Sequence, residues 1–351
     1  MRQPRGRAAQ AIGASASRQD DLLAMTDQGT GEQRGVFLAT ASATRIERRA
    51  ALVIAIASLA AFLAVVPFVR VPLVRLPAFI PSYEAALFFI DLVTAVLLFD
   101  QFARLRSLGV LVLAAGYLFD ALIIIPHALT FPDAFAPTGL LGAKEQTTAW
   151  LYVFWHGGFP LFVMAYAFLR RQDADKVRGV GPAIIAAAIA VVLLVVALTL
   201  AATVGHDWLP VVIQKGDYSL LVRKGISPAV WLLTLAAMAT LWHREQRVVD
   251  LWLMLVMWIW LFDIALAAVL GANRFDLGFY AGRIFGLIAA SFLLATLVVE
   301  MGRMHAGAIS AAASAEQRLA ELARLREPDA VPLRREQTES FIRRQNIAHY
   351  R

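Results

Sequence analysis

The chain has 351 residues, of which 59% are hydrophobic and 17% are charged, and its mean hydropathy is +0.64. An ordinary soluble domain is only about half apolar, so we exclude that class and predict an integral membrane protein. The net charge is +7. Basic residues beside membrane spans are attracted to anionic lipids, which accounts for this charge, so we expect no nucleic-acid binding. The sequence has no cysteine, which excludes disulfides and Cys-ligated metal centres.

Eight apolar runs follow a polar first segment. Residues 1–40 are rich in Arg, Gln, Ala, Ser and Gly without hydrophobic periodicity, so we predict a disordered tail there. A membrane-spanning helix needs about 20 predominantly apolar residues. The predicted fold class is therefore all-α, a polytopic membrane protein with about eight transmembrane helices, at residues 50–69, 84–100, 108–127, 148–169, 182–203, 227–242, 249–270 and 280–300.

Basic residues in the connections predict the orientation. Short cytoplasmic loops carry an excess of Lys and Arg, and such residues crowd the short connections after the second, fourth and sixth spans. Because the number of spans is even, we predict that both termini lie in the cytoplasm. The residues concerned are Arg104, Arg106, Arg170, Arg171, Lys176, Arg178, Arg244 and Arg247.

Residues 305–351 are predicted to form a cytoplasmic helical signalling tail behind a membrane domain of residues 41–304. Small and apolar residues recur three and four apart in a weak coiled-coil seam, at Met304, Ala308, Ala311, Ala315, Leu322 and Leu325. We expect this seam to join two copies of the chain. The tail is too short for a globular enzyme domain with a core of its own.

Ionisable side chains interrupt the predicted spans. A carboxylate that faces lipid costs roughly 2.5–3.5 kcal/mol on insertion scales, so each one needs a reason. Asp91, Asp120, His156 and Asp263 come from different spans and fall at similar depth in the outer half, given a rise of about 1.5 Å per residue. We therefore predict that these side chains converge on one polar pocket.

Helical spacing extends this set and separates one residue from it. Tyr117 and His127 share a helix face with Asp120. Arg283 enters the membrane from the outer side, and we predict that it pairs with Asp263 or Asp91. In contrast, Asp100 lies at the inner boundary beside Arg104 and Arg106, where we predict an interfacial ion pair.

The polar set has more than one interpretation. It is a satisfied hydrogen-bonded network that fixes helix packing, a pocket for a small ligand or for protons, or a haem or metal site built on His127, His156 and His206. The corresponding alternative functions are a small ion- or proton-coupled transporter and a haem-binding membrane redox protein. Because motifs of soluble catalysis are missing, we predict neither an enzyme nor a cofactor.

Four strings carry a resemblance to a known family. They are DLVTAVLLFDQF, GYLFDALIIIPHALTFPDAFAPTGLLG, QTTAWLYVFWHGGFPLFVMAYA and RFDLGFYAGRIFGLIAASFLLA. In this order they resemble the fourth membrane-associated sensor domain family of bacteria, over about residues 36–304. The resemblance implies an eight-helix input module with an unidentified stimulus, normally fused to a diguanylate cyclase or histidine kinase. No such output domain follows, so the chain is either a shortened relative or signals through a separate output protein, and cyclic-di-GMP synthesis is not expected of it. The resemblance also implies a location in the bacterial inner membrane.

The resemblance also implies characteristic residues. Its pattern falls on Asp91, Gln101, Tyr117, His127, Phe131, Pro132, Trp150, Trp155, His156, Arg274, Asp276, Tyr280 and Arg283. Together with the polar set, it gives the candidate ligand-binding residues. These are Asp91, Tyr117, Asp120, His127, Trp155, His156, Asp263, Tyr280 and Arg283. The function predicted is a membrane-integral sensory input module that transmits through its last helix and contacts lipids, a small ligand and a second copy.

Overall fold

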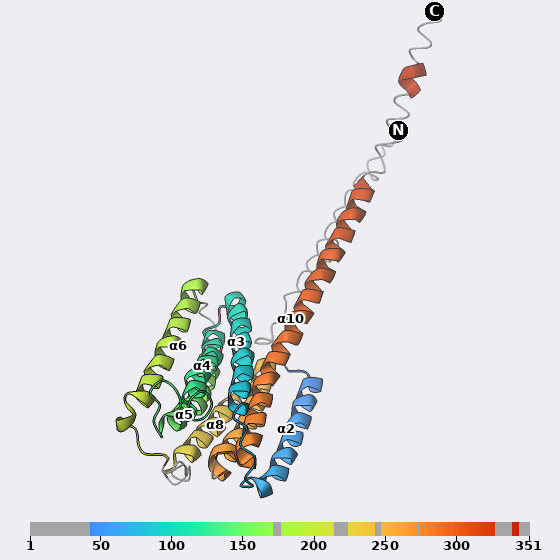
Figure 1. The fold of residues 1–351 in the computed structure, drawn as a ribbon. Helices are drawn as coiled ribbons and strands as arrows, with labels where there is room; N and C mark the ends of the chain where they lie inside the picture. Colours follow the sequence, from blue (N-terminus) through green and yellow to red (C-terminus); the bar gives the residue numbers. More distant parts are fainter. Residues whose placement is uncertain are drawn as a thin grey trace, which may run out of the picture. The chain divides into compact units, whose positions relative to one another are not determined.

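The computed structural model describes residues 43–170, 177–213, 224–242, 247–271, 274–326 and 339–343. Its named elements are all helices (Figure 1). They are α2 (Arg45–Val65), η1 (Val66–Phe68), α3 (Phe79–Leu105), α4 (Leu108–Thr130), α5 (Thr147–Leu169), α6 (Val180–Thr203), η3 (His206–Trp208), α8 (Ile226–Trp242), α9 (Val248–Ile264), η4 (Ala265–Leu270) and α10 (Leu277–Arg326).

The prediction of an all-α polytopic membrane protein is confirmed. Within the described ranges, 7 helices are long and apolar enough to cross a membrane, and α8 is a shorter apolar helix. The predicted spans all coincide with helices. Helices α2 and α3 begin at Arg45 and Phe79, each several residues before the predicted start.

The chain divides after Val298 into two compact units. The first unit holds the helical bundle, and the second holds the part of α10 from Val299 onward and a short helix at residues 339–343. The predicted disordered tail lies outside the described residues, as do residues 327–338 and 344–351. In the predicted seam, the side chains of Ala308, Ala315 and Leu322 are exposed and Ala311 is half-buried, whereas those of Met304 and Leu325 lie outside the described set.

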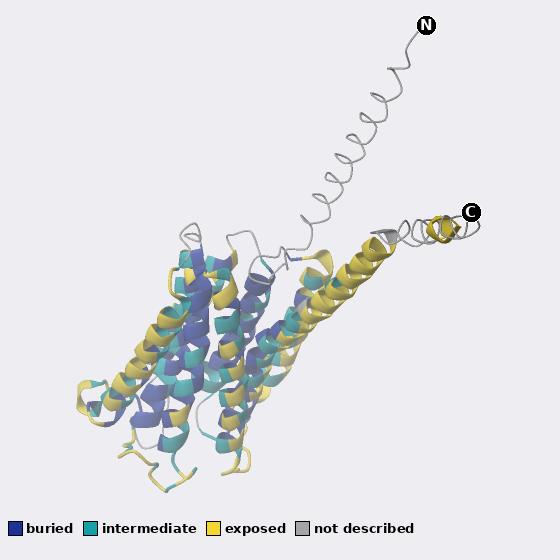
Figure 2. Cartoon of the chain, turned by 90° about the horizontal axis from the view of Figure 1, so that it is seen from above, coloured by how far each residue is buried: buried dark blue, intermediate teal, exposed yellow. Residues whose placement is uncertain are grey.

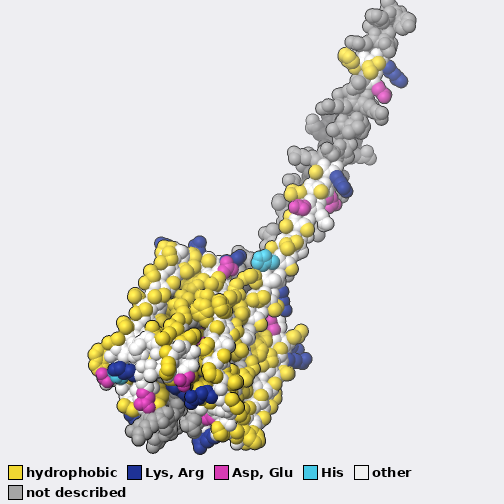
Figure 3. All heavy atoms as spheres, in the orientation of Figure 1, with side chains coloured by type: hydrophobic (Ala, Val, Ile, Leu, Met, Phe, Trp, Pro, Cys, Tyr) yellow, Lys and Arg dark blue, Asp and Glu magenta, His cyan; other side chains and the backbone are white. Residues whose placement is uncertain are grey.

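Burial differs strongly among the helices of the bundle. In α4 and α9, 72% and 67% of the apolar span is buried, against 6% in α2 and 11% in α6. Figure 1 places α2 and α6 at opposite edges of the bundle, and Figure 2 shows buried residues inside and exposed residues at the periphery. Hydrophobic side chains cover most of the face drawn in Figure 3. Such a surface is suited to contact with lipid tails.

Two connections pair at one end of the bundle, which we call the pocket end. It is the end at which α3, α5 and α10 begin. Here the backbone N–H of Leu73 donates to the carbonyl oxygen of Phe275 at 2.9 Å, and the Tyr280 hydroxyl donates to the carbonyl oxygen of Val74 at 2.8 Å. These bonds join the segment before α3 to the start of α10.

A buried ion pair lies at the opposite end of the bundle. Asp250, in the first turn of α9, is fully buried. It accepts hydrogen bonds from the Tyr166 hydroxyl at 2.7 Å and from the Arg247 backbone N–H at 2.9 Å, and it pairs with Arg170. The sequence identified Arg170 only as one of several basic loop residues, yet the structure places it inside the bundle.

Helices α4 and α5 approach closely at a glycine. A Cβ atom on Gly116 would lie 2.7 Å from the Cβ of Phe162, whereas a Cβ on Gly157 would meet nothing nearer than Val230 Cγ2 at 3.8 Å. Because a Cβ is fixed to the backbone, Phe162 has no rotamer that relieves the first contact. Small residues of this kind allow membrane helices to pack closely.

We predict that Gly116→Ala lowers the free energy of unfolding by about 1–3 kcal/mol, because the added methyl forces α4 and α5 apart. The matched control is Gly157→Ala, which has room for its methyl and gains up to about 1 kcal/mol from helix propensity. Thermal unfolding of both variants in the same detergent measures the difference. Equal unfolding midpoints would contradict the close approach.

Candidate functional site

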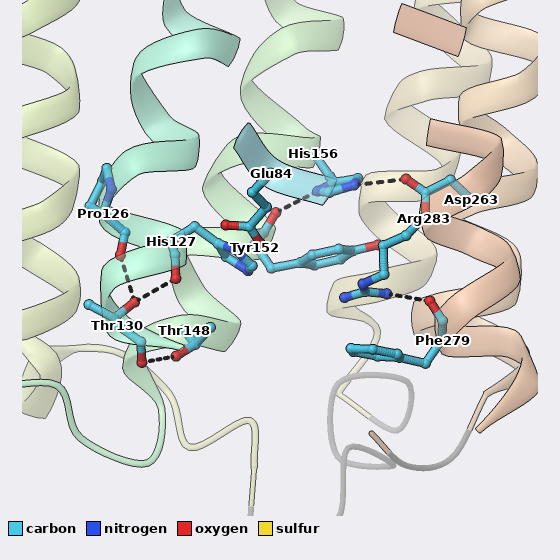
Figure 4. Close-up of polar contacts among 10 residues, drawn as sticks. All are labelled: Glu84, Pro126, His127, Thr130, Thr148, Tyr152, His156, Asp263, Phe279 and Arg283. Carbon is cyan, nitrogen blue, oxygen red and sulfur yellow. Dashed lines mark hydrogen bonds and ion pairs between the residues drawn. The ribbon is translucent and has the colours of Figure 1, made fainter. Parts of the chain in front are cut away.

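Two histidine–carboxylate pairs lie inside the pocket end. His127 Nδ1 on α4 is 2.7 Å from Glu84 Oε1 on α3, and His156 Nε2 on α5 is 3.2 Å from Asp263 Oδ2 on α9. All four side chains are at most 3% exposed. Figure 4 shows both pairs together with Tyr152 and Arg283, so that side chains from α3, α4, α5, α9 and α10 meet.

The hydrogen bonds of His156 determine how many protons its pair carries. Its Nδ1 is 3.1 Å from the carbonyl oxygen of Tyr152, which only accepts, so Nδ1 carries a hydrogen. Its Nε2 faces a carboxylate oxygen of Asp263, and a bond there also requires a hydrogen. That hydrogen belongs either to an imidazolium or to a carboxylic acid. In both cases the His156–Asp263 pair is electrically neutral.

The Glu84–His127 pair was missed in part by the sequence analysis. His127 was a candidate, but Glu84 was placed at the very start of its span, where a charged residue is unremarkable. Because α3 begins at Phe79, Glu84 lies inside the helix and is 1% exposed. It precedes Asp91 by seven residues, or about two turns, which puts both on one helix face. The seven-residue spacing from Asp91 was the sequence feature that could have identified Glu84 as a buried polar residue.

Arg283 does not form the predicted ion pair with Asp263 or Asp91. The described carboxylates make no ion pair with it. Asp263 contacts His156 through Oδ2, and its Oδ1 has no hydrogen-bond partner among the described residues. Arg283 Nη1 donates to the carbonyl oxygen of Phe279 at 3.1 Å, and the guanidinium lies 3.8 Å from the centroid of the Phe279 ring. A cation–π contact therefore stands where a carboxylate was predicted.

Asp263 packs against a bare stretch of α10. A Cβ atom on Gly282 would lie 2.9 Å from Asp263 Oδ1, and one on Gly286 would lie 3.0 Å from Asp263 Oδ2. These glycines, four residues apart, leave room for the carboxylate beside the helix backbone. Directly after Asp263, α9 passes into the π-helical turn η4, and such turns are frequent at functional sites.

A small cavity adjoins the two pairs. Its volume is about 40 Å³, which is room for roughly three water molecules at about 10–15 Å³ each. Two guanidinium groups and two phenyl rings line it, with the Arg274 guanidinium 4.8 Å from the centroid of the Phe131 ring. The lining residues are His127, Phe131, Thr148, Ala149, Tyr152, Ala267, Ala268, Arg274, Phe279 and Arg283.

The remaining candidates form a second polar group and a structural contact. Asp91, Asp120 and Tyr117 interact electrostatically and are all at most 2% exposed. Trp155 adjoins Asp120, and its ring centroid lies 5.6 Å from that of His127. The predicted single pocket is thus two neighbouring groups with Trp155 between them. Tyr280, in contrast, does not line the cavity and is bound to the connection before α3.

Two other predictions have clear outcomes. The Asp100–Arg104 ion pair is present at 2.9 Å and is solvent-exposed, as predicted. His206, a candidate for a haem site, lies 2.9 Å from Asp207 in η3. Within the described ranges, no three His, Asp or Glu side chains are grouped so that they could hold a metal ion.

Comparison with known proteins identifies the family. The model of MASE4, described as a membrane-associated sensor, integral membrane domain, matches residues 74–304. The chain belongs to the MASE4 family. No curated protein and no solved structure matches it. The MASE4 match covers the helices from α3 into α10 and leaves α2 outside, so it begins later than the predicted residue 36.

The MASE4 domain contains both polar groups and the cavity. Of the residues that the resemblance led us to expect as characteristic, Phe131 and Arg274 line the cavity, although neither was among the candidate ligand-binding residues. Asp276, also expected from the resemblance, is buried and accepts a hydrogen bond from the Phe279 backbone N–H at 2.7 Å, at the start of α10.

We predict that Glu84 and His127 are strongly coupled in stability. In a double-mutant cycle with Glu84→Leu and His127→Leu, each single change strands a buried polar partner, so we expect a coupling free energy of about 1–3 kcal/mol. The matched control is the exposed Asp100–Arg104 pair, with an expected coupling below about 0.5 kcal/mol. Reversible unfolding in detergent micelles gives both values. Similar coupling in the two cycles would contradict a buried, desolvated pair.

Proposed function

We propose that this chain is the sensory input module of a bacterial signalling system in the inner membrane. In this proposal the pocket end faces outward, both termini lie in the cytoplasm, and a small ligand or a proton acts on the polar groups around the cavity. The family supports a sensor, and the basic residues between spans support the orientation. The module has no catalysis of its own and passes its state to a separate output protein.

The observation that carries the proposal is the position of α10 in the pocket. Arg283, which lines the cavity, is on α10. Gly282 and Gly286 on the same helix receive the carboxylate of Asp263, which His156 holds from α5. A change of charge or of hydrogen bonding in the cavity therefore acts directly on the first turns of a helix that continues to Arg326.

A signal requires two states that bind the stimulus differently. The polar contacts of the pocket end allow two such states, because Asp263 can pair either with His156 or with Arg283. If Asp263 turned from His156 to Arg283, the carboxylate would shift along the Gly282–Gly286 stretch. Interfaces between packed helices switch between discrete arrangements rather than deforming smoothly. The expected response is a small rotation or translation of α10.

The segment of α10 from Val299 onward supplies the proposed output contact. Ala308, Ala315 and Leu322 are exposed and Ala311 is half-buried within the described residues, so the seam is open to a second copy of the chain. We propose a homodimer through this seam, with a partner protein that reads its rotation. The sequence has no cysteine, so single cysteines report on this contact without background.

We predict that disulfide cross-linking at Ala311→Cys depends on the stimulus. Membranes holding full-length chain are exposed to external pH between about 5 and 8 and to small charged and neutral solutes. The yield of the disulfide-linked dimer should change by about fivefold or more, because ordinary coupling free energies correspond to changes of at least about that size. The control is Ala313→Cys, which lies off the seam, and its cross-linking yield should stay low under all conditions. Yields at Ala311→Cys that never change would contradict transmission through this helix.

One observation favours a second candidate, a proton- or ion-coupled transporter. Asp91 and Asp120 are buried carboxylates that make no ion pair with a described cation, and intramembrane carboxylates mark proton paths. This function predicts flux of a substrate into proteoliposomes, lost in Asp91→Asn. The sensor predicts no such flux, so the same preparation separates the two candidates.

A further inference from the structure

The cavity presents hydrogen-bond donors to whatever enters it. Arg283 has five N–H groups, and one of them is bonded to Phe279. Its side chain is 8% exposed, and it makes no ion pair with a described carboxylate. A buried cation without a paired anion is costly, by several kcal/mol when a partner is removed. Arg283 is therefore a group whose environment favours the arrival of an anion.

The carboxylates nearby do not meet this need. Asp263 and His156 together are neutral, as the hydrogen bonds of the imidazole require. Glu84 directs one oxygen to His127 at 2.7 Å, and its other oxygen is buried without a partner among the described residues. Glu84 and Asp263 share a smaller void with Arg283, but neither carboxylate is part of the cavity lining, whereas both guanidinium groups are.

Aromatic rings orient the cationic groups. The Arg283 guanidinium lies 3.8 Å from the Phe279 ring centroid, and that of Arg274 lies 4.8 Å from the Phe131 ring centroid. A stacked guanidinium presents its N–H edge to a planar acceptor, so Arg283 is suited to bidentate binding of a carboxylate. The same rings, with Ala267 and Ala268, give the cavity apolar walls beside its donors.

We propose that this cavity binds a small monocarboxylate, with its oxygens on Arg283 and its short hydrocarbon part against Phe131 and Phe279. The inference rests on the proposed sensory function and names the class of its ligand. The volume of about 40 Å³ sets the size, because at about 10–15 Å³ for each water-sized probe it admits acetate or propionate. Tyr152, whose hydroxyl has no partner among the described residues, is a further donor beside the cavity.

Binding of acetate and propionate to the full chain in lipid nanodiscs tests the proposal. Isothermal titration measures affinity, and acetamide serves as the neutral analogue of the same shape. We expect acetate and propionate to bind and acetamide not to bind. The change Arg283→Gln should lower the affinity for acetate by about tenfold or more. Arg283→Lys, which keeps the charge without the planar fork, should lie between the wild type and Arg283→Gln.

The matched control is Arg75→Gln. Arg75 also lies at the pocket end and stacks on a phenyl ring, with its guanidinium 4.9 Å from the centroid of Phe275. It is outside the cavity lining and exposed, and it pairs with Asp133 at 3.2 Å. Acetate affinity should be unchanged in Arg75→Gln. If Arg283→Gln does not fold, as judged by its unfolding midpoint, Arg283→Lys replaces it, with a smaller loss of acetate affinity expected.

The outcomes separate this inference from the sensory function. Acetamide that binds as well as acetate, or acetate affinity that is unchanged in both Arg283 variants, overturns the carboxylate assignment. If neither carboxylate binds while cross-linking at Ala311→Cys still responds to another stimulus, the inference fails and the sensor stands. If acetate binds through Arg283 but never changes cross-linking, the site is correct and transmission through α10 is refuted.

Discussion

The bond between His156 and Asp263 organises the pocket end of this protein. A carboxylate inside a membrane bundle must be supplied with a donor, because lipid offers none and leaving it unpaired costs several kcal/mol. His156 meets this demand at 3.2 Å. Its own Nδ1 is held by the Tyr152 carbonyl oxygen, so the ring cannot turn without losing a bond. The position of Asp263 beside α10 follows from this constraint.

Glycine completes the arrangement on the other side of Asp263. With any side chain at Gly282 or Gly286, the carboxylate would collide with a Cβ atom at about 3 Å. Because neither glycine carries a side chain, Asp263 packs against α10 while its Oδ2 is bonded to His156 on α5. Arg283, which lines the cavity, lies on α10 between these two glycines. The lining of the cavity and the niche of Asp263 are therefore formed by the same turn of α10.

Much of the fold could be predicted from the sequence, because hydropathy and length determine where membrane helices begin and end. The depth of Asp120, His156 and Asp263 could also be predicted, since the rise per residue is fixed. Their partners could not. Depth places a residue at a level, but the rotation of each helix about its axis is set by packing against neighbours, which no single span encodes. Arg283 illustrates this, since it shares a level with Asp263 and faces Phe279 instead.

Local signals explain which contacts were found and which were missed. The Asp100–Arg104 pair lies within one helix turn, so spacing alone identified it. Asp250 and Arg170 come from α9 and α5, and their contact depends on how those helices pack. The glycines at 282 and 286 form a small-residue pattern visible in the sequence, yet only the structure shows that a carboxylate occupies the space they leave. Two glycines four residues apart can allow either close helix packing or a niche for a polar side chain. Which of the two forms depends on the residue that faces them, here Asp263.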